Sequence, residues 1–181
     1  AGGNAVEIIG RDRTKVEKFA AALGATSVGT AGTAPTRDIV ILAVPYSSAA
    51  AVISEYGEAL RGKVIIDITN PINADFTDFV TPEGSSGAQE ITKVAPASAH
   101  VVKAFNTLFS HVLAAGPVDS RPLDVFIAGD DSPGKARVSA FIESKGLRPM
   151  DTGALSMART LENVALLNLG LLSHSIKHTN F

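Results

Sequence analysis

The sequence DIVILAVPYSS, residues 38–48, decides the fold class of this chain. Its first seven residues form a nearly unbroken apolar run, and Pro45 ends that run where a helix can begin. Ser47 or Ser48 is expected to cap the helix, because apolar residues recur at helical spacing from there to position 60. A buried strand that leads directly into a helix is the repeating unit of an α/β protein with a parallel sheet.

The same pattern recurs on both sides of this stretch. Residues 6–10 form a short apolar run before a helical pattern that Gly24 ends. Further strands are expected at 26–28, 63–68, 100–105, 123–128 and 147–150, helices at 88–97, 132–144 and 155–174, and a long polar loop at 69–87. This alternation predicts right-handed crossovers and a mostly parallel sheet. We therefore predict a doubly wound α/β fold of Rossmann type over residues 1–150, followed by a C-terminal helical segment, 151–181.

Composition excludes several classes of protein. Of 181 residues, 45% are hydrophobic and 19% charged, which is typical of a folded domain with a full core. The 16 Lys and Arg nearly balance 18 Asp and Glu without long runs, so neither nucleic acid nor a membrane surface is an expected partner. No Cys is present, the four His lack metal-site spacing, and residues 129–132 predict a turn and helix cap. These features predict no metal site and favour a cytoplasmic protein.

One part of the predicted fold is missing from the sequence. A dinucleotide-binding unit normally opens with a strand and G-x-G-x-x-G, whose backbone N–H groups hold the pyrophosphate. This sequence has no such motif, and residues 6–10 follow a Gly-rich turn as the second strand of such a unit would. We therefore expect about 20 N-terminal residues, with the first strand and the Gly-rich loop, to be absent. The result would be an open slot between 6–10 and 38–44.

Basic residues follow the strand at 6–10. At this turn a dinucleotide fold selects its cofactor: an acidic residue binds a ribose 2′-hydroxyl, whereas Arg binds a 2′-phosphate. The turn and the start of the helix hold Gly10, Arg11, Arg13 and Lys15. These residues favour NADP as the cofactor. The alternative is a solvated basic start to a surface helix.

Three further strand ends carry groups suited to a ligand. The expected crevice residues are Val44, Pro45 and Tyr46 after the first of these strands, Asn70 and Pro71 after the next, and Lys103, Ala104, Phe105 and Asn106 at the last. The carboxyl ends of parallel strands meet at one edge, so these residues are expected to line one cleft. The alternatives are a strand terminator at Pro45, a local turn at Asn70, a Lys103 paired with a carboxylate and an Asn106 that caps a helix.

These segments together resemble a known family. The motifs are GRD at 10–12, DIVILAVPYSSAAAV at 38–52, KVIIDITNPI at 63–72, VVKAFNT at 101–107, VFIAGDD at 125–131 and GLRPMDTGALSMARTLE at 146–162. Over nearly the whole chain they resemble the NADP oxidoreductases that depend on coenzyme F420. The resemblance implies hydride transfer between NADP(H) and F420, with Gly10, Arg11 and Lys15 at the 2′-phosphate. It also implies a homodimer whose C-terminal helices cover the deazaflavin site.

The sequence departs from that family at two places. Without the Gly-rich loop, the chain as given is expected to bind NADP weakly. The KAFNT segment at 103–107 resembles the ferric-reductase domains of the six-transmembrane epithelial antigen proteins. An NADPH-dependent flavin or ferric reductase is therefore one alternative, and a non-catalytic NADP-sensing module is another. We expect no residue of this chain to act as acid or base, because hydride transfer between two cofactors depends on their proximity and orientation.

Overall fold

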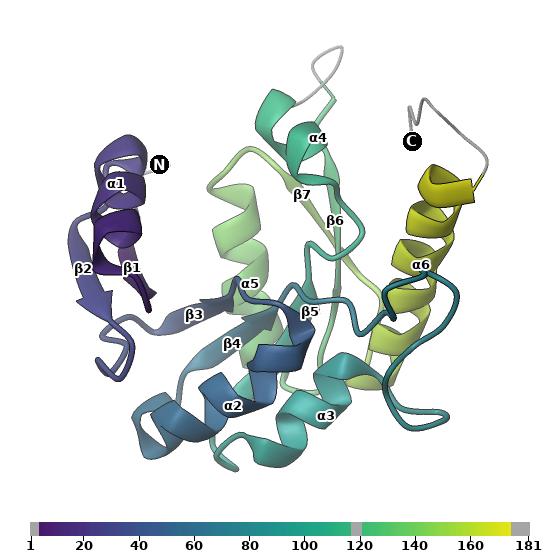
Figure 1. Cartoon of the computed structure of the whole chain (residues 1–181), viewed down its shortest axis with the longest axis horizontal. Coiled ribbons are helices and arrows are strands. Elements are labelled where there is room, and N and C mark those ends of the chain that lie inside the picture. The colour runs from purple at the N-terminus through teal and green to yellow at the C-terminus, as the bar shows by residue number, and fades with distance from the viewer. Residues whose placement is uncertain (1–3, 117–120, 175–181) are drawn as a thin grey trace.

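The computed structural model describes residues 4–116 and 121–174, which build two separate sheets (Figure 1). The larger sheet has the strand order β3-β4-β5-β6-β7. Its strands are β3 (Ile39–Leu42), β4 (Val64–Asp67), β5 (His100–Ala104), β6 (Asp124–Ala128) and β7 (Arg148–Asp151). β3, β4 and β5 run parallel, whereas β6 is antiparallel to β5 and β7 parallel to β6. The predicted Rossmann-type α/β fold with a mostly parallel sheet is confirmed.

Helices cover both faces of this sheet. Alternate residues of a strand point to opposite faces, so Ile65 of β4 joins one apolar cluster while Val64 and Ile66 join the other. The first cluster lies under α2 (Tyr46–Tyr56), α3 (Gly87–Val94) and the start of α6 (Ala158–His174), and the second lies under α5 (Ser132–Glu143). All four residues of β4 are consequently buried. This explains the apolar runs from which the fold was predicted.

Local sequence determines where the helices begin. α3 starts at a capping box in which Ser86 accepts from the Gln89 backbone N–H, and α5 starts at Asp131, which accepts from Gly134. The expected cap of α2 is wrong, because Pro45 occupies the cap position and no side chain caps this helix. The described residues also form three short helices, η1 (Gly57–Leu60), α4 (Ser110–Ala115) and η2 (Leu155–Met157). α4 is not among the helices expected from the sequence.

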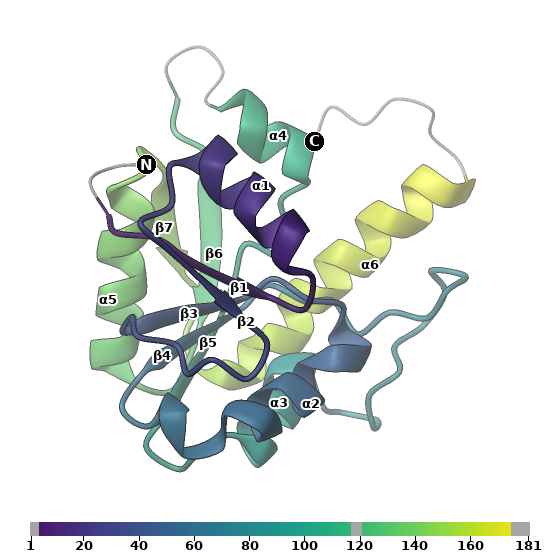
Figure 2. The ribbon, with the colours of Figure 1, turned by 60° about the vertical axis from the view of Figure 1, so that its left-hand side comes forward.

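The smaller sheet contains only β1 (Glu7–Gly10) and β2 (Ser27–Thr30), joined by α1 (Arg13–Leu23). The two strands are parallel, and Gly24 ends α1 at φ 64°, as expected from its position after the helical pattern. In the part of the chain that the structure describes, neither strand pairs with β3 (Figure 2). The expected slot between residues 6–10 and 38–44 is therefore present.

The C-terminal segment follows β7 and consists of η2 and α6. α6 buries Leu161 and Ala165 but leaves Leu167 62% exposed. Among the residues with a described structure, no helix combines the length and apolar character required to cross a membrane. The cytoplasmic location expected from the composition stays a prediction.

Candidate functional site

The ends of three parallel strands meet at one edge of the larger sheet. Leu42 of β3 is the register partner of Asp67 in β4, and Asp67 is the partner of Lys103 in β5. The loops that follow these residues therefore leave the sheet side by side. The ends of the three strands therefore lie side by side, but Val44 and Pro45 line one cavity while Asn70 and Asn106 line another, and a single cleft formed by all these segments stays a prediction.

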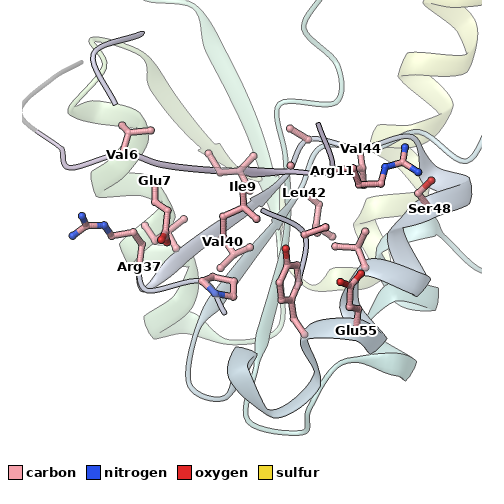
Figure 3. A pocket seen from close by; sticks show the side chains of 18 of the residues that line it. Val6, Glu7, Ile9, Arg11, Arg37, Val40, Leu42, Val44, Ser48 and Glu55 are labelled. Carbon is pink, nitrogen blue, oxygen red and sulfur yellow. The ribbon is translucent and has the colours of Figure 1, made fainter. Parts of the chain in front are cut away.

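The end of β1 lies beside the same crevice. Gly10 is the last residue of β1, and a Cβ atom there would lie 2.8 Å from Cγ2 of Val16, so α1 packs too closely for any side chain. Arg11 follows in an exposed position, and its side chain extends beside Val44 and Ser48 (Figure 3). Within residues 4–116 and 121–174 the Arg11 guanidinium makes no hydrogen bond or ion pair, so it is available to an anion.

The other two basic residues of this turn point elsewhere. Arg13 pairs with Glu17 at 2.8 Å along α1, and Lys15 lies 3.8 Å from Asp12, whose carboxylate also caps the helix by accepting from the Lys15 backbone N–H. Both side chains are about three-quarters exposed, and ion pairs of this kind contribute little to stability. The structure brings Gly10 and Arg11, but neither Arg13 nor Lys15, to the lining of the adjacent cleft.

That cleft separates β1 from β3 and has a volume of about 690 Å³. Its lining comes from β1, from the whole of β3 and from one side of α2. Its middle is apolar, with Ile9, Val40 and Leu42, whereas charged side chains lie toward its ends. A smaller cavity of about 150 Å³ lies at the ends of β4 and β5 and is closed on one side by α6.

The segment after β3 connects the crevice to the core. Val44 packs against the cluster beneath α2, Pro45 is exposed, and Tyr46 is half-buried. Burial is the main cause that raises the pKa of the Tyr46 phenol, and the negative charges of Glu90 and nearby carboxylates add to it. Tyr46 therefore presents a neutral hydroxyl at neutral pH.

Two asparagines join the ends of β4 and β5. Asn70 donates its amide to the Asn106 carbonyl oxygen at 3.2 Å, and Asn106 donates to Asn70 Oδ1 at 3.0 Å and to the Leu161 carbonyl oxygen at 3.1 Å. Asn106 is 7% exposed and its Oδ1 has no partner among the described groups. Phe105, just before it, has a φ of 64°, an unfavourable backbone conformation that is typical of functional sites. Asn106 therefore does not cap α4 and keeps one buried acceptor free.

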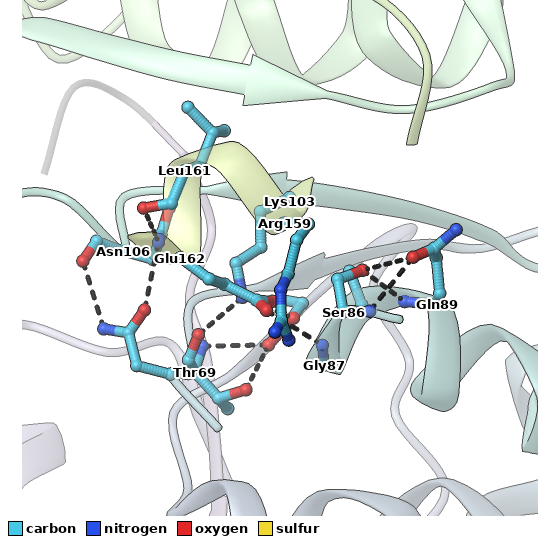
Figure 4. Close-up of polar contacts among 12 residues, drawn as sticks. Thr69, Ser86, Gly87, Gln89, Lys103, Asn106, Arg159, Leu161 and Glu162 are labelled. Atoms are coloured by element: carbon cyan, nitrogen blue, oxygen red, sulfur yellow. Dashed lines mark hydrogen bonds and ion pairs between the residues drawn. The ribbon is translucent and has the colours of Figure 1, made fainter. Parts of the chain in front are cut away.

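Lys103 does not reach the surface of the crevice. Its ammonium is fully buried and contacts Asp67 Oδ2 at 2.9 Å and Glu162 Oε1 at 2.8 Å, and it donates to the Thr69 carbonyl oxygen at 2.5 Å (Figure 4). The alternative of a lysine paired with a carboxylate is the one that the structure contains. Ala104 beside it is also buried and lies in the core cluster under α5.

Sequence reasoning missed Asp67, Glu162 and Arg159. Glu162 accepts from the Gly87 backbone N–H and so joins α6 to α3. Arg159 lies 3.8 Å from the Phe79 ring centroid and donates to Thr81 and to the Ser85 carbonyl oxygen, which holds the loop between β4 and α3 against α6. Each of these three charged residues lies inside an apolar segment of the sequence. A charged residue that is buried requires a buried partner, so this pattern was the one sign in the sequence that could have revealed them.

Pro71, which was expected to line the crevice, is instead buried beside Gly87, where an added Cβ would lie 3.2 Å from the Pro71 ring, and it lines neither cavity. Across residues 4–116 and 121–174, no three His, Asp or Glu side chains are grouped as metal ligands would be.

Comparison with known proteins identifies relatives of this chain. Residues 1–71 match the family model for NADP oxidoreductases that are coenzyme F420-dependent. The F420-dependent NADP reductase of Methanothermobacter marburgensis is 31% identical over 176 residues, which cover 92% of this chain and 73% of that protein. Metalloreductase STEAP3 of Rattus norvegicus is 34% identical over 109 residues, which cover 60% of this chain. The chain spans 21% of the length of that metalloreductase.

Solved structures show the same fold. A hypothetical protein from Sinorhizobium meliloti has a TM-score of 0.73 and 26% identity, with 84% of this chain and 86% of that chain covered. A putative F420-dependent NADP reductase from Arthrobacter sp. FB24 has a TM-score of 0.74 at 23% identity, with 93% of each chain covered.

Proposed function

The chain belongs to the family of coenzyme F420-dependent NADP oxidoreductases, and on this premise we propose that it transfers a hydride between NADP(H) and F420. The observation that carries the proposal is the common edge formed by the ends of β3, β4 and β5 beside the free guanidinium of Arg11. In doubly wound α/β proteins, ligands bind beyond the carboxyl ends of the strands.

The residues present fit the 2′-phosphate and the nicotinamide carboxamide of NADP(H), but not the pyrophosphate between them. Arg11 suits the 2′-phosphate, because a guanidinium binds phosphate with paired, charge-assisted hydrogen bonds. The free Oδ1 of Asn106 suits an amide N–H such as that of the nicotinamide carboxamide. No G-x-G-x-x-G segment is in the sequence to hold the pyrophosphate. We therefore expect weak binding of NADP(H) by this chain.

Binding and orientation are the chemical contributions of these residues. NADP(H), when bound, supplies or takes the hydride at its nicotinamide ring. Arg11 fixes the adenosine end, and Asn106, held by Asn70 and by the Leu161 carbonyl, fixes the nicotinamide end. Lys103 is enclosed by carboxylates and takes no part in proton transfer in this proposal. The rate then depends on how closely the two redox rings are held.

The relative at 34% identity supports a second candidate, an NADPH-dependent metal or flavin reductase. The match to metalloreductase STEAP3 covers 60% of this chain. The two candidates share NADP(H) and differ only in the electron acceptor.

The test is an electron-transfer assay with high NADPH and, in separate reactions, oxidised F420, flavin or a ferric chelate. We expect the absorbance of NADPH to fall only with F420. Turnover with flavin or iron but not F420 favours the second candidate, and binding without turnover favours an NADP-sensing module.

Replacement of Arg11 tests the cofactor preference. We expect Arg11→Ala to weaken NADPH binding by about 2 kcal/mol, roughly thirtyfold, and to leave NADH binding unchanged, because only NADPH carries the 2′-phosphate. The matched control is Arg61→Ala, which removes an exposed arginine paired with Glu58 at the opposite end of the strands. Equal losses for NADPH and NADH in Arg11→Ala would rule out the phosphate contact.

We also propose that the protein acts as a homodimer through α6. Val164, Leu167 and Leu172 are 38%, 62% and 39% exposed on this helix, and burying them would remove apolar surface from water. The smaller cavity is bounded by α6, so a partner subunit there would lie next to the nicotinamide end of the site.

A further inference from the structure

We infer that Lys103 is a positioning residue for the crevice. Its buried ammonium fixes the orientation of the Asn70 and Asn106 side chains and does not itself contact a ligand. The inference deepens the proposed function and, for its effect on the reaction, rests on that function. It gives the lysine a role in the geometry of the site as well as in the compensation of buried charge.

The surroundings of the ammonium hold it in one place. Lys103 Nζ lies 2.9 Å from Asp67 Oδ2, 2.8 Å from Glu162 Oε1 and 2.5 Å from the Thr69 carbonyl oxygen. An ammonium has three N–H groups, which match these three oxygens in number. All three charged side chains are fully buried, so a ligand in the crevice does not touch the ammonium. Lys103 therefore acts on the crevice through its neighbours.

The turn after β4 is held on both sides of one residue. Asp67 Oδ1 accepts from the Thr69 backbone N–H at 2.8 Å and from the Thr69 hydroxyl at 2.7 Å, while Lys103 donates to the Thr69 carbonyl oxygen. That carbonyl belongs to the planar peptide group that joins Thr69 to Asn70. The lysine therefore fixes the plane from which the Asn70 side chain leaves the backbone.

A second set of contacts lies beside the first and nearer the ligand site. Asn106, three residues after Lys103, donates to Asn70 Oδ1 at 3.0 Å and to the Leu161 carbonyl oxygen at 3.1 Å (Figure 4). Each of these partners is the chain neighbour of a residue that contacts the lysine. Lys103 and Asn106 thus join the same three segments, which are β5, the loop after β4, and α6. Only the asparagines line the smaller cavity, so the lysine supports them from within the core.

The backbone between these two sets of contacts is strained. Phe105 has a φ of 64°, and such a conformation persists where the surrounding contacts over-determine it. Removal of the ammonium would release the Thr69 carbonyl and leave Asn106 with partners that are no longer fixed. A misplacement of about 1 Å at a binding group is enough to slow a reaction roughly hundredfold.

The first test is solvent exchange of the Asn70 and Asn106 side-chain amides, measured by NMR on the isotopically labelled protein without cofactor. We expect Lys103→Met to speed this exchange roughly tenfold or more, because the amides lose fixed partners. The double variant Lys103→Met/Glu162→Gln leaves only one buried carboxylate, so it keeps the test available if the single variant does not fold, and we expect the same result. The matched control is Leu60→Ala, which truncates a fully buried side chain at the opposite end of the strands and is expected to leave the exchange unchanged.

A chemical rescue separates the ammonium from the shape of the side chain. The sequence contains no cysteine, so Lys103→Cys creates a unique site for alkylation in urea. Bromoethylamine gives a side chain with the length and the ammonium of lysine, whereas iodopropane gives the same shape with a methyl group instead. After refolding, we expect slow amide exchange only in the aminoethyl form. Equal exchange in the two forms would overturn the inference.

The second readout is the electron-transfer assay with Lys103→Met/Glu162→Gln. We expect kcat to fall roughly tenfold or more, because the nicotinamide end is no longer oriented, and KM for NADPH to change little, because Arg11 still binds the adenosine end. Leu60→Ala is again the control, and we expect it to keep the kcat of the parent protein.

Three results would overturn the inference: Asn106 amides as protected in the Lys103 variants as in the parent, an equal loss of protection in Leu60→Ala, or an unchanged kcat in Lys103→Met/Glu162→Gln when the parent is active. A parent protein without turnover would refute the proposed function alone, because the amide exchange is measured without cofactor. The two failures are therefore distinguishable.

Discussion

The buried ammonium of Lys103 compensates two buried carboxylates, Asp67 and Glu162, that come from different elements. We expect Lys103→Met to destabilise the protein by about 3–5 kcal/mol, because it leaves both carboxylates buried without a cation. We expect Glu162→Gln to be milder, since one cation then faces one carboxylate; its amide oxygen can accept from Gly87, but the NH2 group then faces the Lys103 ammonium and makes one unfavourable donor–donor contact. Urea unfolding measures both free energies.

The matched control for this pair is Lys93→Met, which removes an exposed lysine paired with Glu90 and is expected to cost about 0–1 kcal/mol. If the Lys103→Met variant were as stable as Glu162→Gln, or more stable, the lysine would not compensate both carboxylates.

The position of some single residues could be predicted from the sequence, whereas the position of others could not. Arg11 and Asn70 follow strands whose ends are visible in the sequence, so their place at the crevice was predictable. Asp67 and Glu162 are far apart in the chain, and nothing local shows that they share one lysine. The free Oδ1 of Asn106 depends on contacts with both Asn70 and α6, and so becomes evident only in the folded structure.

At the scale of elements, strands and long helices follow from apolar periodicity, whereas their ends depend on local turns. Pro45 takes the cap position of α2 because its ring fixes the backbone ahead of the helix, which displaces both candidate serines into the first turn. The six-residue helix α4 buries none of its side chains, so it leaves no apolar pattern to read. The polar loop before α3 was expected, but Arg159, which holds it, lies on α6.

The apolar surface of α6 gives a prediction at the same scale. We expect Leu167→Glu to shift the protein from dimer to monomer, because the charge would be buried in the proposed interface without a partner. Sedimentation velocity measures this shift. The matched control is Phe19→Glu on α1, where the side chain is 61% exposed, compared with 62% for Leu167. A monomeric parent protein, or an unchanged dimer in Leu167→Glu, would contradict an interface on α6.

For the whole molecule, the alternation of strands and helices was enough to predict a mostly parallel sheet and the common edge at which the ends of β3, β4 and β5 lie. The absence of a Gly-rich segment was enough to predict the gap between the two sheets. The direction of β6 was not predictable, because an antiparallel strand and a parallel strand with both faces covered have the same apolar pattern. The placement of α6 across the crevice depends on buried polar contacts that no periodicity encodes.

The central claim is that the ends of β1, β3, β4 and β5 form one groove for NADP(H). The most direct measurement is a titration of the isotopically labelled protein with NADPH, followed by NMR of its backbone amides, which detects weak binding. We predict that the largest shifts cluster at Gly10, Arg11, Tyr46, Asn70 and Asn106, and that NADH gives smaller shifts at Gly10 and Arg11. Saturable shifts confined to the opposite ends of the strands, around Arg61 and Ser98, would contradict the account.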